Sequence, residues 1–255
     1  MSGTPVLATQ GLTRRFGGLV AVNDVTMTVP QGQTLGVIGP NGSGKSTFIN
    51  LVTGHLRPTK GTVLIDGKDL TDAKPWVIAG ARVARTFQIV KPFRGMSVRE
   101  NVAVSILYGP DGTGRMAPAL RAADEVLGEV GLAGSGDKAP GELSVADARR
   151  LEFAKALALR PRLLMLDEVM AGLRPAEIEP SLALINTLKA GGMTIIVVEH
   201  VMKAILAVSD QVMVLNQGTL LMTGSPREVL SDPRVIEAYL GQKYAQRQAG
   251  GETGA

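Results

Sequence analysis

Residues 39–47 read Gly39-Pro40-Asn41-Gly42-Ser43-Gly44-Lys45-Ser46-Thr47, which fits the G-x-x-x-x-G-K-[ST] pattern of a phosphate-binding loop. The apolar segment 34–38 before it predicts a short buried strand, and the segment 47–52 after it predicts the start of a helix. A loop between a strand and a helix is the setting in which this pattern binds phosphate. The sequence therefore predicts an α/β protein that binds a nucleoside triphosphate.

The residues of this loop have distinct expected roles. Its glycines let backbone N–H groups converge on phosphate oxygens at the positive end of a helix dipole. We expect Lys45 to reach the β- and γ-phosphates, Ser46 to hold Mg²⁺ and Thr47 to contact the α-phosphate. The predicted nucleotide-binding residues of the loop are Gly39, Asn41, Gly42, Ser43, Gly44, Lys45, Ser46 and Thr47.

A second apolar strand, predicted over residues 163–166, runs directly into two carboxylates, Asp167 and Glu168. At the carboxyl end of a strand, Asp167 can hold Mg²⁺, while Glu168 can face the γ-phosphate and orient or deprotonate an attacking water. An Asp-Glu pair alone is more often a solvent-facing turn. Because it follows a phosphate-binding loop in the same chain, we predict a catalytic pair and an NTP hydrolase.

Two further polar residues are candidates for the same site. His200 follows the predicted strand 194–198, and an imidazole there can hydrogen-bond the γ-phosphate and respond to its loss. Gln88 can offer its amide oxygen to Mg²⁺ or to the water. Each has a simpler explanation, a surface histidine and an ordinary polar loop residue respectively.

The composition narrows the functional classes. The 255 residues include no cysteine, which excludes disulfides, cysteine-ligated zinc and thiol catalysis. The first residues lack the pattern of a secretory signal, and no apolar stretch is long enough for a bilayer span. We therefore expect a membrane role only through partners. The 27 basic and 23 acidic side chains give a net charge of +4, spread along the chain, which indicates a solvated surface and no nucleic-acid partner.

Hydrophobic spacing predicts the rest of the fold. Short strands joined by turns are expected between Val6 and Val29, forming a small antiparallel sheet. Apolar residues at helical spacing next predict a helical region, which is followed by alternating buried strands and helices. Residues 242–255 are expected to form a flexible tail. The predicted helices cover residues 97–107, 119–130, 144–159 and 175–190, and the strand between the last helix and His200 covers residues 194–198.

The order of these motifs resembles the ATPase subunits of ABC transporters, over nearly the whole chain from Val6 to Leu240. The resemblance is closest to the branched-chain amino acid importer branch, which also includes urea and amide importers. The segments that carry this closer resemblance are Arg14–Asp24, Ala84–Ile89, Asp167–Leu173 and Val235–Gly241.

The resemblance implies a fold and a set of site residues. It implies a P-loop NTPase of the ABC type over residues 1–241, with a mixed central sheet, a small antiparallel β-subdomain and a helical subdomain inserted at about 91–160. Phe16 stands where the family stacks an aromatic ring on adenine, and Gln88 and His200 stand at its Q-loop and switch positions. Ser144 begins its signature motif, which reaches the γ-phosphate of ATP across a dimer.

The chain departs from the family pattern at two motifs. The signature, usually Leu-Ser-Gly-Gly-Gln, continues from Ser144 as Val145, Ala146 and Asp147. We expect a capped helix start there, with Asp147 reaching back to the Ser144 amide. A partner ATPase with a regular signature would explain the change, leaving one of two ATP sites stronger. Arg174 replaces an Asp of the family, and Val169 replaces a Pro, which would alter communication between the sites.

The resemblance also implies partners and a place in the cell. It implies an importer ATPase that uses ATP and Mg²⁺, works with a second ATPase subunit in a homo- or heterodimer, and binds transmembrane permease subunits at the cytoplasmic face of the membrane. The permease would dock on residues 89–97, where Phe93 and Met96 either anchor it or simply cover the helical core. Two alternatives stay open: a soluble ABC ATPase acting on nucleic acid or the ribosome, and a regulatory module that has lost hydrolysis.

Overall fold

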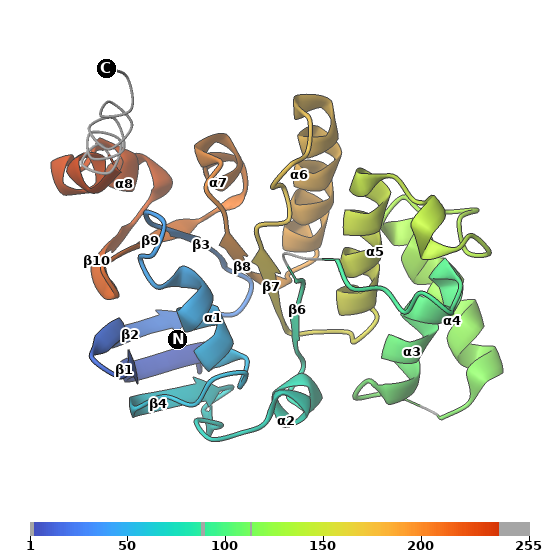
Figure 1. The fold of residues 1–255 in the computed structure, drawn as a ribbon, viewed down its shortest axis with the longest axis horizontal. Coiled ribbons are helices and arrows are strands. Elements are labelled where there is room, and N and C mark those ends of the chain that lie inside the picture. The colour runs from blue at the N-terminus through green and yellow to red at the C-terminus, as the bar shows by residue number, and fades with distance from the viewer. Residues whose placement is uncertain (1–2, 88–89, 113, 240–255) are drawn as a thin grey trace, which may run out of the picture.

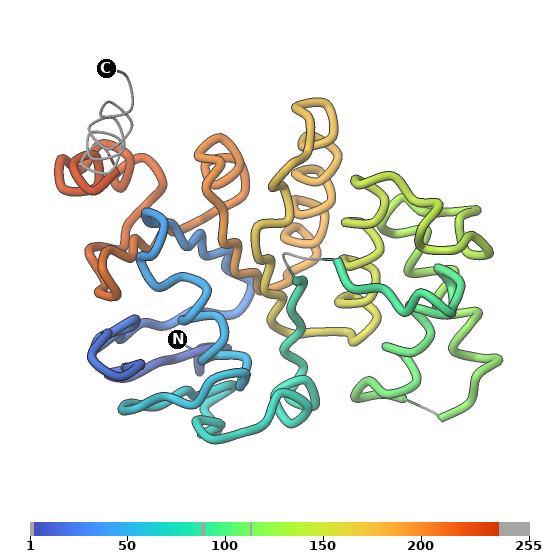
Figure 2. The backbone as a smooth tube through the Cα atoms, viewed as in Figure 1, coloured from blue at the N-terminus to red at the C-terminus, as the bar shows by residue number. Residues whose placement is uncertain are grey.

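The protein is described by a computed structural model that covers residues 3–87, 90–112 and 114–239. Two sheets lie side by side, with helices over the larger sheet and a separate group of helices at one end (Figure 1). The tube in Figure 2 shows the chain leaving β6 (Val83–Arg85) into that helical group and returning to the sheet at β7 (Leu163–Asp167). The predicted α/β class, with a mixed sheet, an antiparallel sheet and a helical region, is confirmed.

The larger sheet has six strands in the order β10-β9-β3-β8-β7-β6. All neighbours are parallel except β10, which runs antiparallel to β9. Three of the four inner strands, β3, β8 and β7, are buried at every residue, as expected for continuous apolar runs in a sheet covered on both faces. The strands not yet given are β3 (Thr34–Ile38), β8 (Thr194–Val198), β9 (Gln211–Asn216) and β10 (Thr219–Gly224).

The smaller sheet is antiparallel, in the order β2-β1-β4-β5. The prediction of short strands between Val6 and Val29 was wrong, because β1 (Leu7–Phe16) and β2 (Leu19–Val29) are ten and eleven residues long. Register shifts interrupt their pairing, so the apolar alternation changes face within each strand and looks like several short strands in the sequence. The sheet is completed by β4 (Lys60–Ile65) and β5 (Lys68–Asp69).

Serine side chains cap the starts of some of the helices. Ser97 and Ser144 cap α3 and α5 through their hydroxyl oxygens, each accepting a hydrogen bond from the backbone N–H three residues later. The helix predicted over residues 175–190 is found with those bounds. The α-helices are α1 (Lys45–Val52), α2 (Pro75–Gly80), α3 (Val98–Tyr108), α4 (Met116–Glu129), α5 (Val145–Leu157), α6 (Pro175–Ala190), α7 (Met202–Val208) and α8 (Pro226–Ser231).

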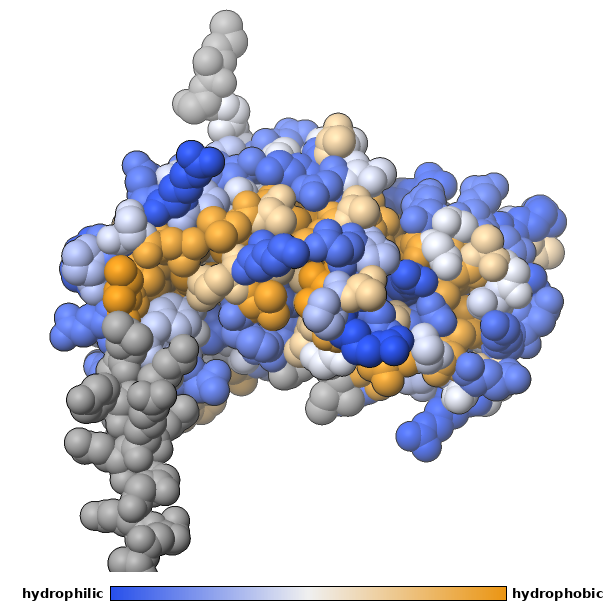
Figure 3. Space-filling view, turned by 90° about the horizontal axis from the view of Figure 1, so that it is seen from above, coloured by the Kyte–Doolittle hydropathy of each residue, from blue (hydrophilic) through white to orange (hydrophobic). Residues whose placement is uncertain are grey.

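Two clusters of buried apolar residues hold these elements together. One joins α3, α4 and α5 to one face of the larger sheet, so the helical region shares a core with that sheet. The other joins the opposite face of the sheet to α1 and the antiparallel sheet. From the side of α6, α7 and α8, apolar side chains form a band among hydrophilic ones (Figure 3). No helix in the described part of the chain is long and apolar enough to cross a bilayer.

The strand order brings the sequence motifs together. Because β3, β8, β7 and β6 are adjacent and parallel, their carboxyl ends lie at one edge of the sheet. The phosphate-binding loop follows β3, Glu199 and His200 follow β8, and Asp167 ends β7. Ligands of open α/β sheets bind at this edge. The fold alone thus places the candidate site.

Phe48 offers a test of the core beneath the phosphate-binding loop. Its side chain is fully buried on α1. We expect Phe48→Ala to lower the free energy of unfolding by about 3–5 kcal/mol, because it removes apolar contacts and leaves a cavity. Tyr108→Ala, at a side chain that is 86% exposed, should change it by less than about 0.5 kcal/mol. Urea unfolding of both variants measures the difference, and equal losses would contradict this assignment of the core.

Candidate functional site

The phosphate-binding loop is held between two backbone segments. Gly44 lies in the left-handed region with φ 102° and caps α1, and a Cβ atom there would lie 2.4 Å from the carbonyl oxygen of Ala21 on β2. A Cβ atom on Gly39 would lie 2.1 Å from the carbonyl oxygen of Leu215 on β9. Only glycine fits at both positions. The loop is therefore shaped by main-chain contacts on both sides.

Lys45 lies inside this loop. Its Nζ donates hydrogen bonds to the carbonyl oxygens of Gly39 at 2.7 Å and Pro40 at 3.0 Å, and the residue is buried. Burial lowers the pKa of the ammonium, while the nearby carboxylates of Glu168 and Asp167 act in the opposite direction. The loop thus fixes the position of the Lys45 side chain, a cation that would contact the phosphates bound by the same loop.

A cleft of about 640 Å³ opens beside the loop. It is bounded on one side by Phe16 and the start of β2 and on the other by the loop and the start of α1. The ring of Phe16 is 42% exposed, and the guanidinium of Arg14 lies 4.6 Å from its centre. An exposed ring at the mouth can stack on a nucleobase. The cleft is lined by Phe16, Leu19, Val20, Ala21, Asn41, Gly42, Ser43, Gly44, Lys45, Ser46, Thr47, Glu168 and Gln217.

The two carboxylates after β7 have different surroundings. Asp167 is buried and pairs with Arg85, whose Nη2 lies 2.7 Å from its Oδ2. Glu168 lines the cleft, and its backbone has φ 50°, which is uncommon for a residue with a side chain. Its N–H donates to the carbonyl oxygen of Val198, which holds this conformation against β8. The unusual backbone turns Glu168 toward the loop while Asp167 stays in the sheet.

Glu199, between β8 and His200, is completely buried. Its Oε1 accepts a hydrogen bond of 2.8 Å from the N–H of Met170, whereas its Oε2 is buried without a partner. Burial raises the pKa of this carboxyl, and the hydrogen bond from Met170 opposes the shift. The residue therefore fixes the segment after Glu168 to the segment that carries His200.

The structure does not bring all of the predicted residues into the cleft. His200 is exposed and does not line it, and Gln88 lies outside the described residues. Ser144 lies at the start of α5 in the helical region, where its hydroxyl donates to Asp147 Oδ2 at 2.8 Å. The expected bond from Asp147 back to the Ser144 amide is not formed, because the carboxylate takes the hydroxyl and Arg150 instead.

Several residues at the site were not identified from the sequence. Arg85, Glu199 and Gln217 contact or line it from three different elements. Gln217 lies in the β9–β10 turn, whose Gly218 donates its N–H to the carbonyl oxygen of Ser43. The glycine indicates a turn in the sequence, but not which loop the turn contacts.

Oxygen ligands at this edge suit Mg²⁺. The carboxylate of Asp167 and the hydroxyl of Ser46 are hard donors, and Mg²⁺ commonly uses one or two protein ligands together with substrate phosphates and water. The described residues hold no group of three or more His, Cys, Asp and Glu side chains that would form a protein-only metal cage. The donor set therefore fits Mg²⁺ bound together with a nucleotide.

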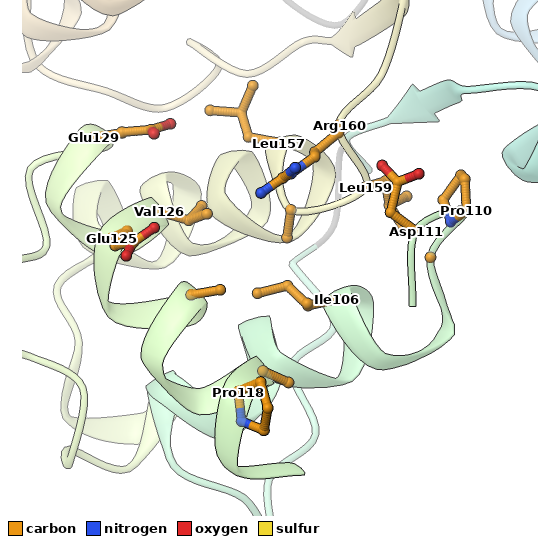
Figure 4. Close-up of a pocket in the computed structure, with 14 residues that line it drawn as sticks. Ile106, Pro110, Asp111, Pro118, Glu125, Val126, Glu129, Leu157, Leu159 and Arg160 are labelled. Atoms are coloured by element: carbon orange, nitrogen blue, oxygen red, sulfur yellow. The ribbon is translucent and has the colours of Figure 1, made fainter. Parts of the chain in front are cut away.

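Another cavity, of about 380 Å³, lies between α3, α4 and the end of α5 (Figure 4). Its lining includes the side chains of Glu125, Glu129 and Arg160 together with apolar residues. None of the described site residues predicted from the sequence lines it. We therefore assign nucleotide binding to the cleft at the phosphate-binding loop.

The raised pKa of Glu199 has a testable consequence. A carboxyl whose folded-state pKa is raised stabilises the fold at low pH, and this stability is lost as the pH rises through the folded-state pKa. We expect Glu199→Gln to be more stable than the wild type at pH 8, by about 1 kcal/mol, because it removes a buried carboxylate oxygen without a partner. As the pH falls toward the ordinary value of 4.5, the difference should shrink. Urea unfolding from pH 5 to 8 measures it, with Glu125→Gln as an exposed control; a difference independent of pH would contradict the prediction.

Two family models match the chain. The model described as ABC transporter matches residues 22–171, which is more than half of the chain. The model described as branched-chain amino acid ATP-binding cassette transporter matches residues 219–245. The first match includes the phosphate-binding loop, the carboxylates after β7 and the helical region between them.

Similar proteins extend over almost the whole chain. This chain is 40% identical over 251 residues to BraF of Pseudomonas aeruginosa, a high-affinity branched-chain amino acid transport ATP-binding protein. The match covers 93% of this chain and 98% of that protein. The chain is 39% identical, with the same coverage, to LivG of Escherichia coli, which has the same description.

Solved structures agree with this kinship. The structure of the ADP conformation of MJ1267, an ATP-binding cassette of an ABC transporter, superposes with a TM-score of 0.84 at 30% identity, covering 93% of this chain and 99% of that one. The fold, the phosphate-binding loop and these matches lead to one assignment: the chain belongs to the ABC transporter family and is one of its ATP-binding, ATP-hydrolysing cassettes.

Proposed function

We propose that this ATPase drives the import of branched-chain amino acids or related small amides through a membrane permease. The observation that carries the proposal is the 40% identity to BraF over 93% of the chain, together with the match of residues 219–245 to the branched-chain amino acid model. BraF and LivG are both named for branched-chain amino acid transport. A soluble ATPase acting on nucleic acid or the ribosome is not favoured by these relatives.

The residues of the cleft divide the chemistry between them. Phe16 stacks on the base, and Lys45 and the loop N–H groups bind the phosphates and stabilise the charge that develops on the transferring group. Glu168 orients or deprotonates the attacking water. Ser46 and Asp167 would hold Mg²⁺, which would supply further neutralisation of the phosphate charge. His200, which does not line the cleft, approaches when the site closes, and Gln88 offers its amide to Mg²⁺ or to the water.

A second ATPase subunit completes the site. Ser144 caps the start of α5 and does not line the cleft of its own chain, so we infer that it contacts the ATP of a partner. The hydroxyl of Ser144 is engaged by Asp147, and Val145 next to it is 67% exposed where the family has a glycine. This segment offers a weaker phosphate contact than a regular signature. We therefore propose a heterodimer at the cytoplasmic membrane face, whose second subunit brings the regular signature.

The permease docks on the surface around Phe93 and Met96, which are 50% and 39% exposed. Asn101, fully buried on α3, holds this segment in place. Its Oδ1 accepts a hydrogen bond from the N–H of Phe93, and its Nδ2 donates to the carbonyl oxygens of Phe93, Met96 and Ser97. Exposed apolar side chains on a rigid segment suit anchors for a permease helix better than a cover for the helical core.

Glu168→Gln tests the catalytic assignment. The amide keeps the shape of the side chain but cannot accept a proton, so we expect ATP turnover to fall at least about 100-fold while ATP binding stays within about two-fold. Turnover and the binding of a fluorescent ATP analogue are measured on the assembled transporter. Glu129→Gln, an exposed carboxylate beside the other cavity, is the matched control and should keep full turnover. Unchanged turnover in Glu168→Gln would remove Glu168 from the mechanism.

Affinity purification from detergent-solubilised membranes tests the partners. We expect the tagged chain to recover two permease subunits and a second ATPase, together with ATPase activity. Phe93→Ser combined with Met96→Ser should reduce permease recovery at least several-fold, because it removes the apolar anchors. Tyr108→Ser, at an exposed aromatic on the same helical region, should leave recovery unchanged. Recovery with ribosomes or nucleic acid in place of membrane proteins would overturn the transport proposal.

A further inference from the structure

Arg85 stands at the centre of a polar network beside the candidate metal site. It is the last residue of β6, and its side chain is 11% exposed. Nη2 pairs with Asp167 Oδ2 at 2.7 Å, and Nη1 donates to Asn50 Oδ1 at 2.6 Å on α1. The guanidinium also lies 5.2 Å from the centre of the Phe87 ring. One side chain thus connects α1, β7 and the segment that leads to Gln88.

This ion pair differs from most others in the chain. Of the ion pairs between described residues, only Arg85–Asp167 and Lys155–Glu152 have both side chains less than one-fifth exposed. Taking two charges out of water is costly unless all their hydrogen bonds are formed. Arg85 does not meet that condition, because its Nε is buried without a partner. Stability alone is therefore a poor explanation for this pair.

The carboxylate that Arg85 occupies is also the one expected to hold Mg²⁺. A guanidinium and a divalent cation that share one carboxylate repel each other, and at a partly buried position the repulsion is poorly screened by water. A metal ion at Asp167 must therefore either displace the guanidinium of Arg85 or bind despite the repulsion from its positive charge. Lys45 brings another positive charge to the same edge and is tied to its own loop.

We propose that Arg85 is a positioning residue that competes with Mg²⁺ for Asp167 and so weakens metal binding at the site. This rests on the proposed function of Asp167 as a metal ligand. The phosphates of ATP add negative charge, which offsets the positive charges of both the metal ion and the guanidinium. The competition with Arg85 therefore makes metal binding depend on the nucleotide. Displacement of Arg85 also loosens its contact with Phe87, at the entrance to the segment that docks the permease.

Metal affinity measured apart from turnover tests this proposal. Mn²⁺ replaces Mg²⁺, and its binding to the protein, without nucleotide and with ATP, is followed by the loss of the free-ion signal in electron paramagnetic resonance beyond the loss that the same ATP concentration causes alone. We expect Arg85→Ala to bind Mn²⁺ about ten-fold more tightly than the wild type without nucleotide, because the competing charge is gone, and the gain to be smaller with ATP. Arg85→Gln keeps N–H donors for Asn50 and Asp167 but has no charge, so it should also bind Mn²⁺ more tightly than the wild type. This second variant keeps the test decisive if the alanine variant does not fold.

Thermal unfolding supplies a second readout. With ATP and a chelator, Arg85→Ala should lower Tm by about 5 °C, because it leaves Asp167 as a buried charge without its partner. Added Mg²⁺ should recover most of that loss. Two controls break ion pairs elsewhere: Lys155→Ala breaks the other buried pair, and Arg162→Ala breaks an exposed pair with Asp66. Both variants should keep the wild-type Mn²⁺ affinity, and the Tm change of each should be the same with and without metal.

The outcomes separate the two levels of the proposal. Mn²⁺ affinity that is unchanged or weaker in Arg85→Ala and Arg85→Gln overturns the competition, even when the wild type binds metal normally. Wild-type protein that binds no Mn²⁺ with ATP, or an Asp167→Asn variant that binds it as well as the wild type, overturns the metal role of Asp167 and the competition with it.

Discussion

The parallel register of four neighbouring strands is the constraint on which the site depends. Backbone hydrogen bonds align β3, β8, β7 and β6, so four loops from distant parts of the sequence emerge at one edge. Each loop contributes a different chemical group. The strands themselves carry almost only apolar side chains, which are buried in the two core clusters. The core thus fixes the relative positions of the groups that the loops carry.

Charge at this edge is arranged in layers. Lys45 lies within the phosphate-binding loop, Glu168 faces the cleft, and the Asp167–Arg85 pair lies behind them in the sheet. Glu199 is further inside, where burial favours its neutral form. Phosphate groups would enter where positive charge and N–H groups converge, with the carboxylate of Glu168 facing them and that of Asp167 paired with Arg85 behind. Pairing and burial thus allow one small region to hold carboxylates and still bind an anion.

The parts of the site that depend on local sequence were predictable. The phosphate-binding loop, the carboxylates after β7 and the helix over residues 175–190 all follow from patterns within a few residues. Arg85 and Glu199 were missed because their partners are remote, Asp167 being 82 residues from Arg85 and Met170 being 29 residues from Glu199. Those contacts exist only once the strand order is known. The long strands β1 and β2 were misjudged for a related reason, since bulges change which residues face the core.

Carbonyl oxygens of the main chain oppose Gly39 and Gly44 of the phosphate-binding loop more closely than any side chain does. The main chain of β2 and β9 is the same whatever side chains those strands carry. Exposed side chains of both strands can therefore vary without disturbing the loop, provided that the strand paths are kept. The loop itself has no such freedom, because any Cβ atom at Gly39 or Gly44 would collide with an atom that no substitution can remove. Tolerance to substitution should consequently differ across this contact. Exposed positions of β2 and β9 should accept substitutions, whereas Gly39 and Gly44 should accept almost none.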